Sequence, residues 1–206
     1  MQMTSGVRKF ALTTHVMSSV GWFGAVAAFL SLAVAGVASS NPQIVRSAYV
    51  TMELVTWAVI VPFSVATLIT GVIQSLGTPW GLFRYYWIVA KLTLSVVATI
   101  ILLVHTQPIG RVASLAAERV LSSVDLHQLR LRLIADAGAA IAALLVATTL
   151  SVYKPWGLTP YGRGAIGRTS STSTVGNVRR SLWIIALVIA LALFALMHLV
   201  GGGFHH

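Results

Sequence analysis

The sequence predicts an all-α integral membrane protein: a bundle of about five transmembrane helices, with a four-helix core and one accessory helix. Hydrophobic residues make up 57% of the chain and charged residues only 9%, which leaves too little polar surface for a water-soluble fold. The apolar residues also form continuous blocks of about 20 residues or more, the length that a helix needs to cross a hydrocarbon core. The blocks are rich in Ala and Leu and do not alternate, which favours helices over barrel strands.

Five blocks are long enough to span a bilayer, and Pro62 inside the second block predicts a kink in that helix. The first block is too long for a cleaved signal peptide. The predicted spans are Phe10–Gly36, Leu54–Leu76, Tyr85–His105, Leu133–Val152 and Ser181–Val200.

Composition shifts along the chain predict three segments. Residues 1–156 form the four-helix core, in which apolar residues at helical spacing predict a short amphipathic helix on the outer surface near 109–121. Residues 157–180 are rich in Gly, Ser and Thr and predict a flexible cytoplasmic linker. Residues 181–206 hold the fifth span and the C-terminal tail.

The formal charge of +10 is a signal of membrane orientation here, because the basic residues lie in the short connections between spans. They favour a multi-pass protein of the cell (inner) membrane, with a cytoplasmic N-terminus and the C-terminus outside. The expected partners are the lipid bilayer and either a membrane redox or transport protein or a second copy of this chain; nucleic acid is not expected. The chain has no cysteine, which excludes disulfides, thiolate metal sites and a cysteine nucleophile.

His15 and Lys91 are predicted to lie at similar depth, because each lies about five or six residues inside the inner end of its span. Two nitrogen bases at one level could ligate a single metal centre if burial keeps the lysine neutral. In the alternative interpretation, His15 bonds a neighbouring helix and the Lys91 side chain extends to the inner headgroups.

Four further ionisable groups are predicted near the outer ends of their spans. Two histidines and two carboxylates suit a divalent transition metal. Their closeness to the interface also allows simple hydration. These residues are Glu53, His105, Asp136 and His198.

Lys91 and His105 fall on nearly the same face of one helix, since about 14 residues at 100° each return to within roughly 40°. This spacing is similar to that in membrane cytochromes, in which one helix offers a ligand to a haem in each leaflet, and the resemblance implies a two-haem arrangement. In it, His15 with Lys91 holds an inner haem and His105 with His198 holds an outer one.

Two helices resemble a family of bacterial membrane proteins. The first carries Lys9 and His15 followed by Trp22 and Gly24, and the third carries Trp87-Ile88-Val89-Ala90-Lys91-Leu92-Thr93-Leu94 and ends at His105. These motifs are similar to the haem-containing, oxygen-independent protoporphyrinogen oxidases, and more loosely to copper resistance D proteins and their uncharacterised relatives. The resemblance implies a haem b cofactor, with His15 and Lys91 in one haem-associated site of a membrane oxidoreductase.

Trp22 lies about two turns from His15 on nearly the same face, and Gly21 and Gly24 beside it could leave a gap for a flat macrocycle. The alternative is ordinary small-residue helix packing. The leading functional hypothesis is a haem-binding, redox-linked membrane protein. The alternatives are a protein that transports or handles a metal or small molecule, and a non-catalytic accessory subunit of a membrane complex.

Overall fold

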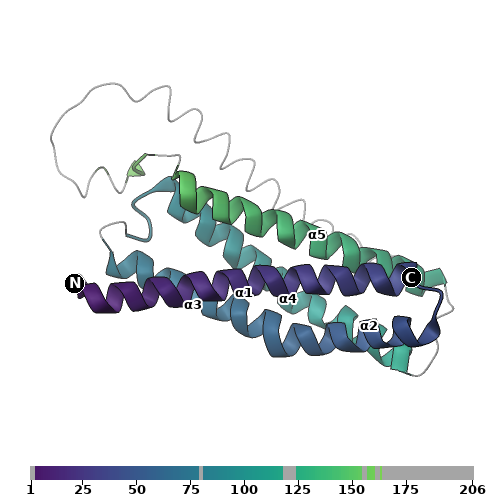
Figure 1. Cartoon of the computed structure of the whole chain (residues 1–206). Helices are drawn as coiled ribbons and strands as arrows, with labels where there is room; N and C mark the ends of the chain where they lie inside the picture. The colour runs from purple at the N-terminus through teal and green to yellow at the C-terminus, as the bar shows by residue number, and fades with distance from the viewer. Residues whose placement is uncertain (1–2, 79–80, 118–123, 155–156, 161–162, 164–206) are drawn as a thin grey trace. The chain divides into compact units, whose positions relative to one another are not determined.

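A computed structural model describes residues 3–78, 81–117, 124–154, 157–160 and 163. These residues form helices and no β-strand (Figure 1). The predicted fifth span and His198 lie outside them. The helices are α1 (Ser5–Ala38), α2 (Pro42–Val55), the π-helical turn η1 (Thr56–Ile60), α3 (Val61–Gly77), α4 (Tyr86–Ala117) and α5 (Val124–Tyr153).

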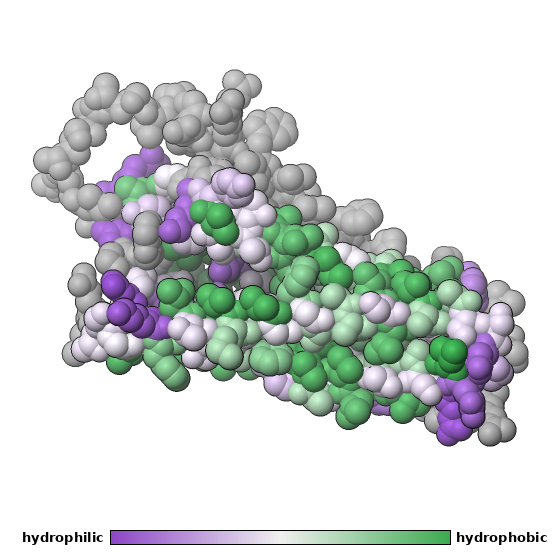
Figure 2. All heavy atoms as spheres, viewed as in Figure 1, coloured by the Kyte–Doolittle hydropathy of each residue, from purple (hydrophilic) through white to green (hydrophobic). Residues whose placement is uncertain are grey.

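Four helical segments of the described part of the chain are long and apolar enough to cross a membrane. On the face shown in Figure 2, hydrophobic residues cover the lengths of the helices, and hydrophilic residues gather near helix ends. This agrees with the predicted all-helical class and with the four predicted spans that fall within the described residues. The segments are Ser5–Ala38, Pro42–Gly77, Tyr86–Leu115 and His127–Tyr153.

The turn between α1 and α2 follows from its residues. Asn41 has extended backbone, and its side-chain oxygen accepts a hydrogen bond of 2.9 Å from the backbone N–H of Gln43. Pro42 occupies the first helical position, where its missing N–H costs no helical hydrogen bond. α2 therefore starts at Pro42, well before the predicted start at Leu54.

The second span changes its helical geometry just before Pro62. The N–H of Val61 bonds the carbonyl of Thr56, five residues back, and residues Thr56–Ile60 form the π-helical turn η1. Pro62 has no N–H to give to the carbonyl one helical turn earlier, so the ordinary α-helical ladder cannot continue unchanged there. The irregularity expected at Pro62 thus takes the form of a π turn.

The described residues divide into two compact units, to which each long helix contributes. Of the described residues, those within 3–14, 68–97 and 145–163 form unit 1, and those within 15–67 and 98–144 form unit 2. Unit 2 contains a buried apolar cluster, which draws on α1, α2, η1, α4 and α5. It includes Trp22, Phe29, Tyr49, Met52, Val112 and Leu133.

α4 is continuous to Ala117 and so includes residues 109–117 of the separate surface helix that the sequence predicts at 109–121, whose last residues lie outside the described part of the chain. Ile109 and Val112 belong to the buried cluster of unit 2, and Val112 is completely buried. The apolar face of this stretch therefore packs against protein, which removes the reason for it to lie on a lipid surface.

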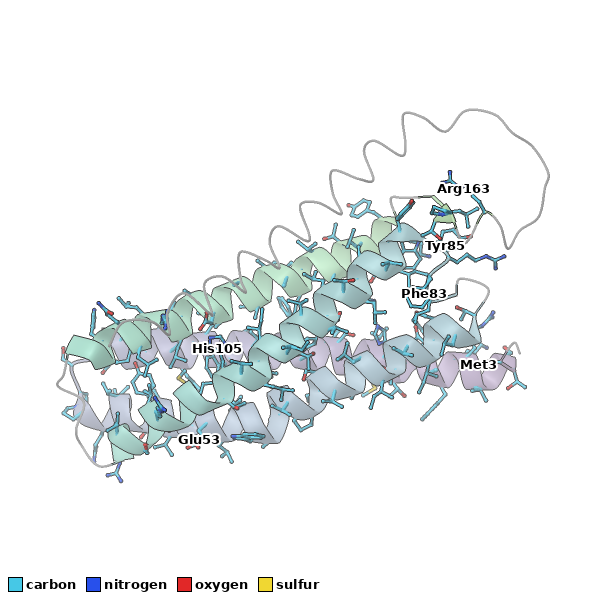
Figure 3. All side chains as sticks on the ribbon, turned by 180° about the vertical axis from the view of Figure 1, so that it is seen from behind. Met3, Glu53, Phe83, Tyr85, His105 and Arg163 are labelled. Carbon is cyan, nitrogen blue, oxygen red and sulfur yellow. The ribbon has the colours of Figure 1, made fainter. Side chains whose placement is uncertain are left out.

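Within unit 1, side-chain hydrogen bonds fix two connections. Gln74 of α3 donates to the carbonyl of Ala11 in α1 at 2.8 Å. The Thr159 hydroxyl donates to the carbonyl of Phe83 at 2.6 Å, and its backbone N–H donates to Arg84 at 2.9 Å. The first residues of the predicted linker thus pair with the segment before α4, in the region where Figure 3 labels Phe83 and Tyr85.

Candidate functional site

A close contact between ionisable side chains of unit 2 joins His105 of α4 to Asp136 of α5. The His105 Nε2 atom lies 3.0 Å from Asp136 Oδ2. The other ring nitrogen, Nδ1, lies 2.9 Å from the carbonyl oxygen of Ile101, one turn earlier in α4. Both side chains are only partly exposed, at 17% for His105 and 32% for Asp136. Figure 3 labels His105 on its helix.

The number of protons on the pair decides which of its two contacts are hydrogen bonds. A neutral imidazole carries one hydrogen, which can serve either the carbonyl of Ile101 through Nδ1 or the carboxylate of Asp136 through Nε2. Both contacts are hydrogen bonds at once only if a second proton is present, on the ring or on the Asp136 carboxyl group. The pair can therefore bind one proton beyond the state of a neutral ring beside an ionised carboxylate.

The pair lies further from the helix ends than the sequence suggested. His105 lies about ten residues before Leu115, and Asp136 about nine residues after His127, which is about 15 Å along each span. The sequence prediction took His105 as the end of its helix, whereas α4 continues to Ala117. The reason is the burial of Ile109 and Val112, which keeps the chain helical beyond His105.

Glu53 of α2 lies against α4 beside a glycine. A Cβ atom on Gly110 would lie 3.3 Å from Glu53 Oε1, so the missing side chain gives the carboxylate room. Among the residues that the structure describes, no three or more His, Cys, Asp or Glu side chains group so that they could hold a metal ion. Of the three predicted ligands that the structure describes, His105 and Asp136 are in direct contact with each other.

A second polar cluster joins α1, α2 and α5, and sequence reasoning missed it. The Arg130 Nε atom donates to the Tyr49 hydroxyl at 2.6 Å, and its Nη2 atom donates to the carbonyl of Gly36. The guanidinium carbon also lies 5.3 Å from the centre of the Tyr49 ring. In the sequence, Arg130 is one of the basic residues that signal orientation, and no motif around it indicates a partner on α2.

His15 and Lys91 fall in different units. His15 belongs to unit 2, where it is 6% exposed within the apolar helix α1. Lys91 belongs to unit 1, where it is half-buried in α4. His15 is therefore buried within unit 2.

The space next to Trp22 is partly filled by protein. Trp22 is 2% exposed and lies in the core of unit 2. A Cβ atom on Gly21 would lie 3.0 Å from the Phe63 ring, whereas one on Gly24 would meet no atom within 4 Å. Gly24 is exposed on the outer face of α1. Gly21 therefore serves close packing of α1 against α3, and a macrocycle beside it would have to displace Phe63.

His105 is not available as an iron ligand in this arrangement. Each of its ring nitrogens lies within hydrogen-bonding distance of a protein oxygen. An axial ligand needs one nitrogen with a free lone pair. An outer haem on His105 would require the contact with Asp136 to open, and its predicted partner His198 lies outside the described residues.

Comparisons with protein-family models, with curated proteins and with solved structures give no match for this chain. The resemblance to haem-containing membrane oxidases therefore stays a prediction. The function is inferred from the geometry of the residues themselves.

Proposed function

We propose that this chain is a multi-pass membrane protein for proton-coupled transport or handling of a small solute, with His105 and Asp136 as its proton-binding site. The observation that carries the proposal is the 3.0 Å contact between the two side chains, in the interior part of two membrane-length apolar helices. Ionisable residues in such helices mark ion and proton pathways more often than they mark simple packing.

The lengths of the spans give the depth of the His105–Asp136 pair in a bilayer. If each candidate span is centred on a hydrocarbon core about 30 Å thick, His105 and Asp136 both lie roughly 6–7 Å from the midplane. Glu53 then lies about 10 Å from the midplane. All three side chains would be within the hydrocarbon layer, far enough in to need a partner or a path for water.

The energies favour a functional role over a structural one. Placing one charged side chain at the centre of a transmembrane helix costs roughly 2.5–3.5 kcal/mol on insertion scales. A hydrogen bond between membrane helices returns on average only about 0.6 kcal/mol. Two apolar side chains would hold α4 to α5 at lower cost than His105 and Asp136 do.

Loss of the shared proton gives the pair a way to drive a change of structure. With the proton present, the Nε2 and Oδ2 atoms attract each other across 3.0 Å. Without it, the ring has one hydrogen for two acceptors, so either the bond to Asp136 or the bond to the Ile101 carbonyl is lost. In the state that keeps the hydrogen on Nδ1, the contact between α4 and α5 is lost, which couples proton release to the packing of these two helices.

A transport assay tests this function. The protein is reconstituted in liposomes with an imposed pH gradient, and a panel of divalent metal cations and small organic solutes is added in turn. At least one solute should collapse the gradient with the wild type, and that response should be lost in His105→Gln and in Asp136→Asn. His127→Gln is the matched control, because His127 lies exposed on α5 and the wild-type response should persist.

Two results of the assay would contradict the proposal. One is that no solute in the panel collapses the gradient. The other is that His105→Gln and Asp136→Asn respond as the wild type does.

Haem binding is the second candidate function. The observation that favours it is the burial of His15 in an apolar helix, two turns before the buried Trp22. In this alternative His15 and Lys91 would be the residues that hold the haem, which would supply one-electron chemistry when bound. The absorption spectrum of the purified protein tests it directly.

A further inference from the structure

Unit 2 buries several hydroxyl groups between the His105–Asp136 pair and His15. They come from α1, from the second span and from α4, and each is less than a tenth exposed. They are Ser18, Thr56, Ser64, Thr67, Thr99 and Thr106.

Two close contacts set the levels of these hydroxyls along the helices of unit 2. Gly110 of α4 lies beside Glu53 of α2. Ser64 lies about eleven residues after Glu53, and Thr99 lies about eleven residues before Gly110. Because the two helices are antiparallel, both steps lead toward His15, and Ser64 and Thr99 lie at about the same level. Thr56 and Thr106 share a level in the same way, next to His105.

The second contact continues the series toward His15. Gly21 of α1 lies beside the ring of Phe63 in α3. Ser18 and Thr67 are each about one turn further along these two antiparallel helices, and His15 follows Ser18 by about one more turn. Buried polar groups thus recur at intervals of about one to two turns, roughly 5–10 Å, from His105 to His15.

The Thr99 hydroxyl indicates that a ligand belongs in this series. Its oxygen is buried and has no hydrogen-bond partner among the described residues. By contrast, Thr56, Ser64 and Thr106 donate to carbonyls of their own helices at 2.7, 2.8 and 2.7 Å, which leaves their oxygens able to accept. Water satisfies such groups in protein interiors when two or more polar partners are near.

We propose that these hydroxyls line a chain of water molecules that carries protons between the His105–Asp136 pair and His15. The proposal deepens the proposed function, on which it rests, by giving the intramembrane proton site a connection toward the end of unit 2 at His15. Water is the bound ligand, and hydrogen-bonded water passes a proton on without any change in oxidation state.

On the side of the His105–Asp136 pair that faces away from His15, the neighbouring polar groups are charged. Glu53 lies on α2 about one turn beyond the pair, and Arg132 lies on α5 about one turn before Asp136, near enough to act on His105 electrostatically. Arg130 is engaged by Tyr49 and by the carbonyl of Gly36. The uncharged, buried part of the series therefore runs only from the pair toward His15.

Solid-state NMR with transfer of magnetisation from water to protein, in lipid bilayers, tests the proposal. Water should reach Thr99, Ser64 and Ser18 at least about tenfold faster than it reaches Thr93, which is exposed on the outer face of α4. Thr99→Val keeps the side-chain shape and removes the hydroxyl, so it should slow the transfer to Ser18. Thr93→Val is the matched control and should leave that transfer unchanged.

Transfer to Thr99 no faster than to Thr93 would overturn the water chain, and so would an unchanged rate at Ser18 in Thr99→Val. Neither result would contradict the proposed proton site, because NMR of the His105 ring nitrogens measures the protonation of that site separately. A His105 ring signal that does not respond to pH would instead contradict the proposed function.

Discussion

The ring of Tyr49 lies where a side chain on Gly36 would be: a Cβ atom at position 36 would lie 2.7 Å from Tyr49 Cζ. Tyr49 is 1% exposed, and Arg130 holds its hydroxyl. The ring therefore cannot swing away freely, so α1 and α2 approach each other this closely only because residue 36 is glycine.

Gly36→Ala should destabilise the protein by about 1–3 kcal/mol, the usual cost of adding atoms to a packed interior. Thermal unfolding in detergent, followed by circular dichroism, measures the change. Gly24→Ala is the matched control on the same helix, because a Cβ atom there meets no atom within 4 Å. Equal unfolding temperatures for the two variants would contradict the close packing of Gly36 against Tyr49.

Tyr49→Phe should cost roughly 1.5–3 kcal/mol, the range for a hydrogen bond that involves a charged group. The substitution keeps the ring but removes the oxygen that accepts from Arg130 Nε at 2.6 Å. The same unfolding assay, extended to Arg130→Met and to the double variant, isolates the energy of this pair. Tyr153→Phe, at a site that is 77% exposed, should have little effect, and a similar loss at both tyrosines would contradict the assignment.

The absence of cysteine allows the orientation to be tested with single introduced thiols. Ser5→Cys lies at the start of α1 and Ser40→Cys in the turn before α2, and both positions are exposed. If the N-terminus is cytoplasmic, a membrane-impermeant maleimide added to intact cells should label Ser40→Cys but not Ser5→Cys. The reverse pattern would contradict the predicted orientation.

A haem-binding protein should be coloured. Protein purified after expression with added haem precursor should show a Soret band that His15→Ala and Lys91→Ala weaken or shift, if those residues hold the haem. His127→Ala, on an exposed site, should leave the spectrum unchanged. A colourless wild type would contradict the second candidate function and leave the proton site unaffected.

The fold class followed from the sequence because hydrophobic block length is a local property. The helix ends did not follow, since they depend on packing: Asn41 and Pro42 start α2 early, and the buried Ile109 and Val112 carry α4 beyond His105. This difference moved the predicted interfacial groups Glu53, His105 and Asp136 toward the interior parts of their spans.

The sequence predicts which residues of the candidate site are unusual, but it does not predict which of them are in contact. An ionisable residue in an apolar block is visible in the sequence, and both His105 and Asp136 were found in that way. Their contact, and that of Arg130 with Tyr49, depends on how separate helices rotate and pack. The buried hydroxyls gave no sequence signal, because serine and threonine occur on every face of these helices.

The central claim is that His105 and Asp136 share a proton that exchanges with water, and nitrogen-15 NMR of the histidine rings in lipid bilayers measures this most directly. His127→Gln helps to assign the His105 signals. In the wild type, the His105 signals should change reversibly with bulk pH, and Asp136→Asn should shift the pH at which they change. Signals that stay constant across the pH range, or that behave identically in wild type and Asp136→Asn, would contradict the claim.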